Sequence, residues 1–347
     1  MRRYQPLLLI TFFLVVTIIT GITYLSGYAG RSNPENIKNM QSINVYTTLP
    51  IELISILTQE YEKNQNIRIN LVPLSEQELL TRISLKNTET SADIIIANQP
   101  VLEKVKKANM LQPSTSEQTD IIAERFKDEN NYWTGLWYDP IVFAENQDFL
   151  KKVPKVPTKW HDITQDSKYR ICLTDFLAAE ASANLLYMLI AVNGEAPTFT
   201  YLNKIHSQIV QYPKFLATPV RMVGMGEADI AIATQSETLR YINNNFPIQI
   251  IYPEDGTAFV LTGVGLLVGT QQEAAAKHFI DWLLQDSAHK ILTHNNFYFI
   301  PTNPETLNYK QYATKNIKLW ENKENFTTEQ KSQLLDKWVK TVRFAAK

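Results

Sequence analysis

The chain has 347 residues, in which 34 Lys and Arg balance 35 Asp and Glu to give a net charge of -1. Nucleic-acid-binding proteins usually present a basic face, so this balance argues against a nucleic-acid partner. Apolar residues make up 44% of the chain, enough to bury full cores, and the length predicts about two domains. Cys172 is the only cysteine, which excludes an intramolecular disulfide and a thiolate zinc cluster.

The N-terminus predicts export. Arg2 and Arg3 precede an almost wholly apolar run at residues 7–25. At about 19 residues the run is longer than an ordinary signal core and close to a membrane span. Two alternatives therefore remain open for residues 1–30: a signal peptide cleaved after Ala29, or a retained anchor in the cytoplasmic membrane. Both predict an extracytoplasmic protein, in the periplasm or at the cell surface.

The first part of the chain alternates strand and helix patterns. Strands are predicted at 43–46, 67–71 and 92–97, each followed by an amphipathic helix. Thr47 and Thr48 provide hydroxyls to cap the first helix, with Pro50 in its first turn, and Ser75 with Glu78 has the spacing of a capping box. This alternation predicts an α/β lobe with a mainly parallel sheet.

Two segments interrupt the alternation and are interpreted as crossings between lobes. Residues 133–145, WTGLWYDPIVFAE, place aromatic residues around a Gly and an Asp-Pro before a β-prone run, and are predicted to lead outward. Residues 253–257 join the apolar runs 248–252 and 259–268 through Pro and Gly around two acids, which is turn chemistry. They are predicted to form the return hinge.

Between the crossings the chain predicts a second α/β unit, and after them a set of helices. Strands are predicted at 170–174, 214–217 and 228–233, and helices at 179–192, 198–210, 218–226 and 236–243. After the return, a helix is predicted at 273–284 with a continuation to about 293, and Thr327 is predicted to cap the last helix.

Six phrases occur in an order that resembles the type II extracytoplasmic solute-binding proteins of ABC importers, in particular the iron(III)/thiamine/sugar-phosphate-binding group. They are INVYTTLP (43–50), WTGLWYDPIVFAENQDFL (133–150), VPTKWHDITQDSKYRICLTD (156–175), VRMVGMGEADIAIA (220–233), IIYPEDGTAFVLTGVGLLV (250–268) and AAAKHFIDWLLQDSAHKIL (274–292). The resemblance covers about residues 42–310.

The resemblance implies an α/β fold of two lobes, each a mainly parallel sheet flanked by helices, joined by two crossing strands. Lobe 1 would comprise 42–137 plus 257–310 and lobe 2 138–256, followed by C-terminal helices at 311–347. A ligand would bind between the lobes at the carboxyl ends of strands. The expected ligand-binding residues are Thr47, Thr48, Asn98, Gln99, Tyr138, Asp175, Ser182, Thr218, Arg221, Thr234, Gln235 and Gly256.

Several of these residues also have a simpler structural interpretation. Thr47 and Thr48 could serve only as helix caps. Thr218, at a helix start with Arg221 in the first turn, could hold an anion or simply cap a surface helix.

The chain departs from the family pattern at two loops. Iron-binding members carry paired tyrosines after the strand that matches 228–233, whereas residues 234–237 are Thr-Gln-Ser-Glu. Ferric iron held by phenolates, and any other metal site, is therefore not predicted. The loop at 175–182 lacks the small hydroxyl residues usual after Asp-Pro, and Glu180 would oppose a phosphate there.

We predict no catalytic residue and no cofactor. The five histidines lack metal-ligand spacing, and neither a nucleophile elbow nor a P-loop occurs. Related lobes occur in the deaminase that builds linear tetrapyrroles, but that enzyme needs a cofactor-bearing loop cysteine, and Cys172 lies in a predicted strand.

The predicted function is a monomeric extracytoplasmic receptor that captures a small polar or anionic solute for the permease and ATPase subunits of an importer. Closure is expected at residues 138–140 and 252–257. The alternative is a membrane-anchored sensor that signals ligand binding to a partner protein.

Overall fold

The computed structural model describes residues 41–84, 92–166, 168–321 and 326–344. The predicted signal peptide or anchor at residues 1–30 lies outside them. Within the described ranges, no helix is both long enough and apolar enough to cross a bilayer.

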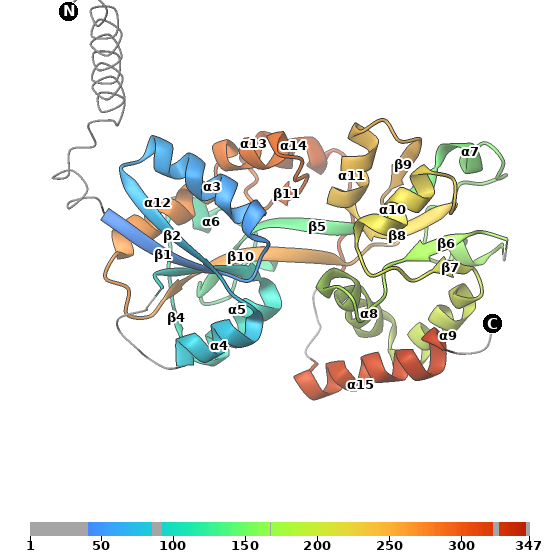
Figure 1. Ribbon diagram of the computed structural model, residues 1–347, viewed down its shortest axis with the longest axis horizontal. Coiled ribbons are helices and arrows are strands. Elements are labelled where there is room, and N and C mark those ends of the chain that lie inside the picture. Colours follow the sequence, from blue (N-terminus) through green and yellow to red (C-terminus); the bar gives the residue numbers. More distant parts are fainter. Residues whose placement is uncertain (1–40, 85–91, 167, 322–325, 345–347) are drawn as a thin grey trace, which may run out of the picture.

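The described chain forms two α/β halves side by side, connected by two long strands (Figure 1). Hydrogen-bonded strands follow one another in the order β2-β1-β3-β10-β5-β8-β6-β7, with β4, β9 and β11 at the sides. The predicted α/β architecture is therefore confirmed, and its sheets are mixed because the long strands run antiparallel to their neighbours.

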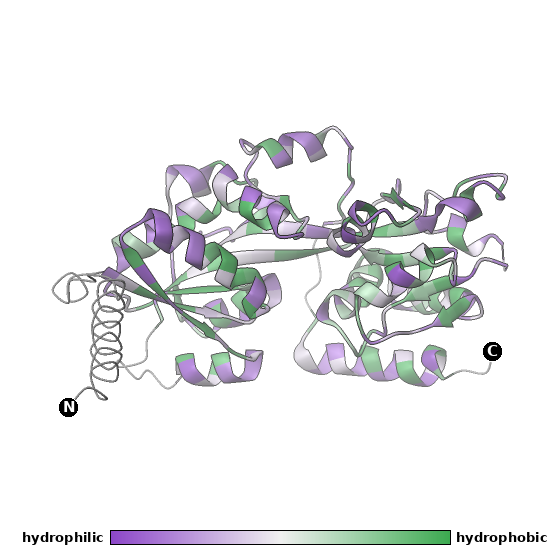
Figure 2. Cartoon of the chain, turned by 45° about the horizontal axis from the view of Figure 1, so that its top comes forward, coloured by the Kyte–Doolittle hydropathy of each residue, from purple (hydrophilic) through white to green (hydrophobic). Residues whose placement is uncertain are grey.

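The first half is built on a sheet in which β1 pairs in parallel with both β2 and β3. Its strands are β1 (Gln41–Thr47), β2 (Ile67–Pro73), β3 (Ile94–Asn98), β4 (Leu111–Gln112), β10 (Phe259–Leu267) and β11 (Ile300–Pro301). Its helices are α3 (Ile51–Asn64), α4 (Glu76–Ser84), α5 (Gln99–Lys107), α6 (Glu117–Asp120), η2 (Glu124–Phe126), α12 (Glu273–Leu283), α13 (Asp286–His294) and α14 (Leu307–Ala313). One continuous apolar core joins the sheet to these helices, as the apolar colouring of the inner faces indicates (Figure 2).

The second half is built on a smaller sheet in which β6 pairs in parallel with β7 and β8. Its strands are β6 (Ile171–Leu173), β7 (Ile209–Gln211), β8 (Ile230–Thr234) and β9 (Ile248–Ile251). Its helices are α7 (Gln147–Leu150), η3 (Asp162–Thr164), α8 (Glu180–Asn193), α9 (Glu195–His206), α10 (Ala217–Gly224) and α11 (Gln235–Asn243). Two apolar clusters form its core, one that includes α8 and α9 residues and one that includes α10 residues.

Strand β5 (Trp133–Asn146) belongs to both halves. All of its 14 residues are buried. Its first part pairs with β10 and β11, and its second part pairs with β8 and β9. The chain returns between β9, in the second half, and β10, in the first, through a turn in which the Gly256 amide donates to the Pro253 carbonyl at 3.1 Å. Both crossings predicted from the sequence are present.

The final helix, α15 (Thr328–Trp338), and a single π-helical segment, η4 (Val339–Arg343), pack on the second half. Trp338 is fully buried, with its ring centroid 4.9 Å from that of Phe176. The predicted cap at Thr327 is confirmed as a capping box with Gln330. This helix therefore adds to the core of the second half although it is remote in sequence.

Four predictions about the elements are wrong in detail. Residues 209 and 210 belong to β7 and do not end the helix predicted at 198–210, because β7 pairs with β6. The strand predicted at 214–217 is replaced by a bend leading into α10. The helix predicted to continue to about 293 breaks at Gln285, whose backbone is extended. Pro50 lies at the cap of α3 and not inside its first turn.

Candidate functional site

The carboxyl ends of the parallel strands point toward the junction of the two halves (Figure 1). On β10, Thr262 lies beside Asn98, the last residue of β3. On β5, Ile141 lies beside Thr234, the last residue of β8. Loops that follow these strands therefore gather around the crossings, which is where open α/β sheets bind ligands. We call this region, built from residues 47–50, 98–99, 175–180 and 234–236, the interlobe site.

Asn98 connects the two halves directly. Its Nδ2 donates to Oε2 of Glu180, the first residue of α8, at 2.7 Å, and its Oδ1 accepts from Thr262 Oγ1 at 2.9 Å. Asn184, one turn further along α8, donates to the carbonyl of Phe259 at 2.9 Å. The pKa of Glu180 is raised above its ordinary value because loss of hydration disfavours the charged carboxylate, and the hydrogen bond from the Asn98 amide offsets part of this rise. The sequence indicated Glu180 only as an obstacle to phosphate, whereas the structure shows it as a contact across the junction.

The start of α11 makes the second contact between the halves. Gln235 is fully buried; its Nε2 donates to the Tyr298 carbonyl at 2.9 Å, and its Oε1 accepts from the Tyr252 hydroxyl at 2.7 Å. The Ser236 amide donates to Asp139 Oδ1 at 3.0 Å, and its hydroxyl donates to the other carboxylate oxygen. Burial raises the pKa of Asp139 to about 7, although the bonds from Ser236 oppose the rise.

Five tyrosines that are scattered along the sequence form a group near Asp139, and two of them, Tyr252 and Tyr312, interact with its carboxylate. Their phenols influence one another or the carboxylate electrostatically: Tyr138, Tyr252, Tyr298, Tyr309 and Tyr312. Burial, with a smaller effect from Asp139, raises the pKa of Tyr312 to about 12. The Lys315 ammonium lies 5.7 Å from the ring centroid of Tyr252 and 5.5 Å from that of Tyr312. Of these five only Tyr138 was predicted, because no local pattern links the others.

Three predicted hydroxyl residues are buried and already bonded. Thr47 Oγ1 donates to the Ile96 carbonyl at 2.8 Å and accepts from the Leu49 amide at 3.1 Å. Ser182 Oγ donates to the carbonyl of Asp175 at 2.9 Å. Thr234 lies 3.4 Å from the Ser236 hydroxyl, oxygen to oxygen. These side chains shape the loops, whereas Thr48 is half-buried in the same loop as Thr47 and is the more accessible of the two.

Two predicted residues on α10 lie at other helix positions than the sequence indicated. Thr218 is the second residue of the helix and caps nothing with its side chain; its amide donates to the Phe215 carbonyl at 3.1 Å. Arg221 lies in the second turn, not the first, and its Nη1 is 3.3 Å from the sulfur of Met225. The guanidinium therefore extends toward the helix end instead of its start.

Asp175 and Gly256 have structural roles. Asp175 accepts from the Leu177 amide at 2.9 Å and from Arg343 Nε at 3.1 Å, which fastens the C-terminal segment to the second half. Gly256 has a φ of +97°, and a Cβ there would lie 2.6 Å from Trp320 Nε1. Only glycine fits this point of the return turn.

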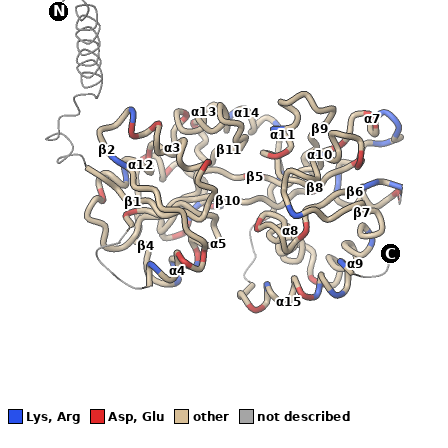
Figure 3. Tube along the Cα trace, in the orientation of Figure 1, with Lys and Arg blue, Asp and Glu red and all other residues tan. Residues whose placement is uncertain are grey.

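A groove of about 1000 Å³ lies between α5 and the start of α15, and Gln99 is among its lining residues. Phe259 and Arg125 also line it, with the Arg125 guanidinium 6.0 Å from the Phe259 ring centroid, and Phe126 stacks on Tyr138 with a centroid distance of 5.0 Å. The lining carries both signs of charge, and basic and acidic residues are interspersed over both halves (Figure 3).

The side chains that could bind a metal ion are poorly placed to do so together in the described part of the chain. Across the described ranges no group of three or more His, Cys, Asp and Glu side chains is arranged to hold one. Tyr241, the nearest tyrosine after β8, packs against Phe246 with a centroid distance of 5.0 Å and so turns into the core. The loop after β8 therefore supplies no phenol.

Two α/β halves joined by two crossing strands, with strand ends facing across the junction, define the two-lobed periplasmic-binding-protein fold of type II. Residues 89–324 match the model of a family described as bacterial extracellular solute-binding protein. The chain belongs to this family, whose members are binding proteins and not enzymes.

Three similar proteins are described below, and the names of two of them state a ligand. A probable ABC transporter periplasmic-binding protein of Sinorhizobium fredii is 25% identical over 234 residues, covering 64% of each chain. A periplasmic binding protein of Actinobacillus pleuropneumoniae with fructose-6-phosphate bound shares the fold with a TM-score of 0.68 and 20% identity, covering 88% of this chain and 99% of that one. The apo ferric ion-binding protein A of Pasteurella haemolytica gives 0.71 and 19%, covering 88% and 100%.

Proposed function

We propose that this protein is an extracytoplasmic receptor that captures a small polar or anionic solute between its lobes. It delivers the solute to the permease and ATPase subunits of an ABC-type importer and acts as a monomer. Lobe 1 comprises residues 42–137 and 257–310, and lobe 2 residues 138–256, with the C-terminal helices at 311–347. The observation that carries the proposal is the Asn98–Glu180 hydrogen bond, which joins strand-end loops of opposite lobes.

The chemistry of the interlobe site suits a solute with several hydrogen-bonding groups. The Asn98 carboxamide both donates and accepts, and the Glu180 carboxylate accepts, so a hydroxyl or ammonium group could replace the bond between them. The partly accessible Thr48 and Gln99 lie on the adjoining loops. A solute that contacts both lobes favours the closed arrangement by its differential contacts, with bending at residues 138–140 and 252–257.

Two features of the site bear on the choice of solute. Glu180 at the start of α8 disfavours a phosphate at that helix end, because like charges would meet there. The tyrosines around Asp139 supply phenols from other elements than the loop after β8, so ferric iron belongs in any screen. Relatives whose names refer to iron and to a sugar phosphate make these two the first compounds to compare.

The proposal is tested by a thermal-shift screen of the full-length chain in a mild detergent, with ferric citrate, fructose-6-phosphate, inorganic phosphate, thiamine, polyamines and amino acids. A compound at a hundred times its Kd adds about 2.7 kcal/mol to native stability. Asn98→Ala and Glu180→Gln should each reduce the shift, whereas Lys204→Gln, an exposed change on α9, should not. A shift that survives both site variants would place the solute elsewhere, and no shift in the whole panel would favour the anchored-sensor alternative.

A further inference from the structure

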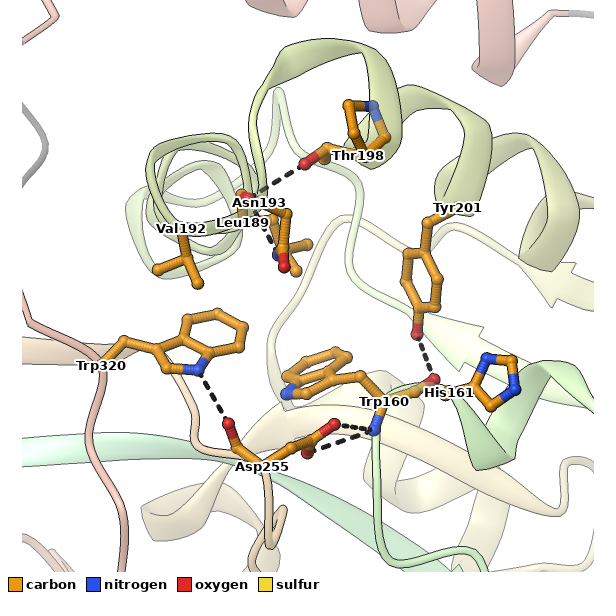
Figure 4. Close-up of a pocket in the computed structure, with 10 residues that line it drawn as sticks. Trp160, His161, Leu189, Val192, Asn193, Thr198, Tyr201, Asp255 and Trp320 are labelled. Carbon is orange, nitrogen blue, oxygen red and sulfur yellow. Dashed lines mark hydrogen bonds between the residues drawn. The ribbon is translucent and has the colours of Figure 1, made fainter.

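A second cavity lies away from the interlobe site, inside the second half. It has a volume of about 360 Å³ and opens between α8, α9 and the return turn (Figure 4). Its lining includes Trp160, Tyr201, Asp255 and Trp320, with Leu189 and Val192 of α8 opposite the indoles. This volume is at the lower end of the range for small-molecule sites.

Three aromatic rings form one side of the cavity. The ring centroids of Trp160 and Trp320 are 5.6 Å apart with their planes at 33°, and those of Trp160 and Tyr201 are 6.5 Å apart at 74°. Their polar atoms are already bonded. Trp160 Nε1 donates to the Gly256 carbonyl at 2.8 Å, Trp320 Nε1 to that of Asp255 at 3.3 Å, and the Tyr201 hydroxyl to that of Trp160 at 3.0 Å. An occupant would therefore meet ring faces and edges.

The cavity also contains a carboxylate without an ion-pair partner among the described residues. Asp255 is exposed, and among the described residues its carboxylate accepts only from the Trp160 amide, at 3.2 and 3.4 Å, apart from a contact with its own backbone. Lys159 is near enough to act on it, but the Lys159 ammonium is placed 3.9 Å from a carboxylate oxygen of Glu254. In the described ranges, the Lys and Arg side chains that stack on rings do so on other aromatic residues than these three.

Aromatic faces with one carboxylate are the chemistry that recognises alkylated ammonium ions, because the ring quadrupole attracts a cation that is too weakly hydrated to prefer water. We infer that this cavity, the Trp160–Trp320 pocket, binds a small organic cation of the quaternary ammonium class. The inference does not depend on the proposed importer function. Because both indoles hold carbonyls of the return turn, an occupant would rest directly on that crossing.

Choline is the probe, and isothermal titration calorimetry on the full-length chain in a maltoside detergent is the measurement. Its neutral isostere, 3,3-dimethylbutan-1-ol, has the same shape without the charge. Choline should bind at least about tenfold more tightly than the isostere, since cation–π and carboxylate contacts together contribute about 1.4 kcal/mol or more. Asp255→Asn should reduce choline affinity about tenfold, and Trp320→Leu should abolish measurable binding.

Matched variants locate the site. The interlobe variants Asn98→Ala and Glu180→Gln should leave choline affinity unchanged, and the circular dichroism of Asp255→Asn should match that of the natural chain. Equal affinity for choline and the isostere would overturn the inference, as would no binding of choline or loss of choline binding in the interlobe variants alone.

Discussion

The two crossings between the lobes are built in opposite ways. The outward crossing, β5, is a continuous strand with every residue buried and a partner strand on each edge in both halves. The return at residues 253–257 is a polar turn whose carbonyls are held by two indole N–H groups. β5 is therefore held by strand pairing along its length, whereas the return combines the two indole bonds with isolated backbone bonds, such as those from the Glu254 amide to the Thr158 carbonyl and from the Thr257 amide to the Lys318 carbonyl, each at 2.9 Å. Single substitutions should affect the return through local contacts and β5 through burial.

Burial along β5 has an electrostatic consequence. Asp139 receives two hydrogen bonds from Ser236, whereas both carboxylate oxygens of the fully buried Glu145 have no hydrogen-bond partner among the described residues. Burial raises the pKa of Glu145 to about 8. The protonated form is thus the one that the folded state favours, and the two carboxyls of one strand differ in how well they are satisfied.

The largest expected effect is that of Glu145→Gln at alkaline pH. With a pKa near 4.5 in the unfolded chain and about 8 in the folded one, Glu145 favours folding fully below pH 4.5, and this contribution is lost as the pH rises to about 8. The variant should therefore exceed the natural chain in unfolding free energy at pH 9 by on the order of 4 kcal/mol, with little difference at pH 4.5. Urea unfolding at the two pH values measures this.

Asp139, the other carboxyl group on β5, provides the control for the Glu145→Gln experiment. In the Glu145→Gln background, Asp139→Asn should remove a further loss of stability that develops above pH 3.8 and is complete near pH 7, because burial raises the pKa of Asp139 from 3.8 to about 7. A difference between Glu145→Gln and the natural chain that is the same at both pH values would show that Glu145 is not held protonated.

The next effect is that of Gly256→Ala in the return turn. The new Cβ would meet the Trp320 indole at 2.6 Å at a φ of +97°, so we expect a loss of about 3 kcal/mol in unfolding free energy. Gly226→Ala is the matched control, with a φ of +73° and nothing within 4 Å of the added atom. It should lose only about 1 kcal/mol from backbone strain, and equal losses at the two positions would contradict the packing argument.

The smallest losses of unfolding free energy are expected for substitutions of the two indoles, Trp160 and Trp320. Trp160→Phe leaves the buried Gly256 carbonyl without its donor and should cost about 1.5 kcal/mol, whereas Trp320→Phe breaks a longer bond at a half-buried ring and should cost about 0.5 kcal/mol. Both variants remove the same atoms, so thermal unfolding compares the bonds directly. A larger loss for Trp320→Phe would reverse their ranking.

The sequence predicted the elements that depend on local pattern. The apolar runs at 92–97 and 228–233 are β3 and β8, and the predicted capping box at Ser75 and cap at Thr327 are present, because pattern and cap lie within a few residues of each other. The short β7 was missed because pairing with β6, which is remote in the chain, overrides its helical pattern.

The site was harder to predict because its contacts join distant residues. The sequence indicated Asn98 but not its bond to Glu180, 82 positions away, and indicated Gly256 as a ligand residue when its neighbour is Trp320. The tyrosines around Asp139 come from four separate parts of the chain, so spacing alone gave no signal for them. Contact between the predicted ligand-binding residues and a solute remains a prediction.

Closure of the lobes on a solute is tested most directly by measuring a distance between the two lobes. Spin labels can be attached through Lys63→Cys on α3 and Lys204→Cys on α9, both exposed, because Cys172 is fully buried. Pulsed electron resonance should give a shorter distance when the compound with the largest thermal shift is added, and Asn98→Ala should weaken the change. An unchanged distance with that compound bound would contradict closure.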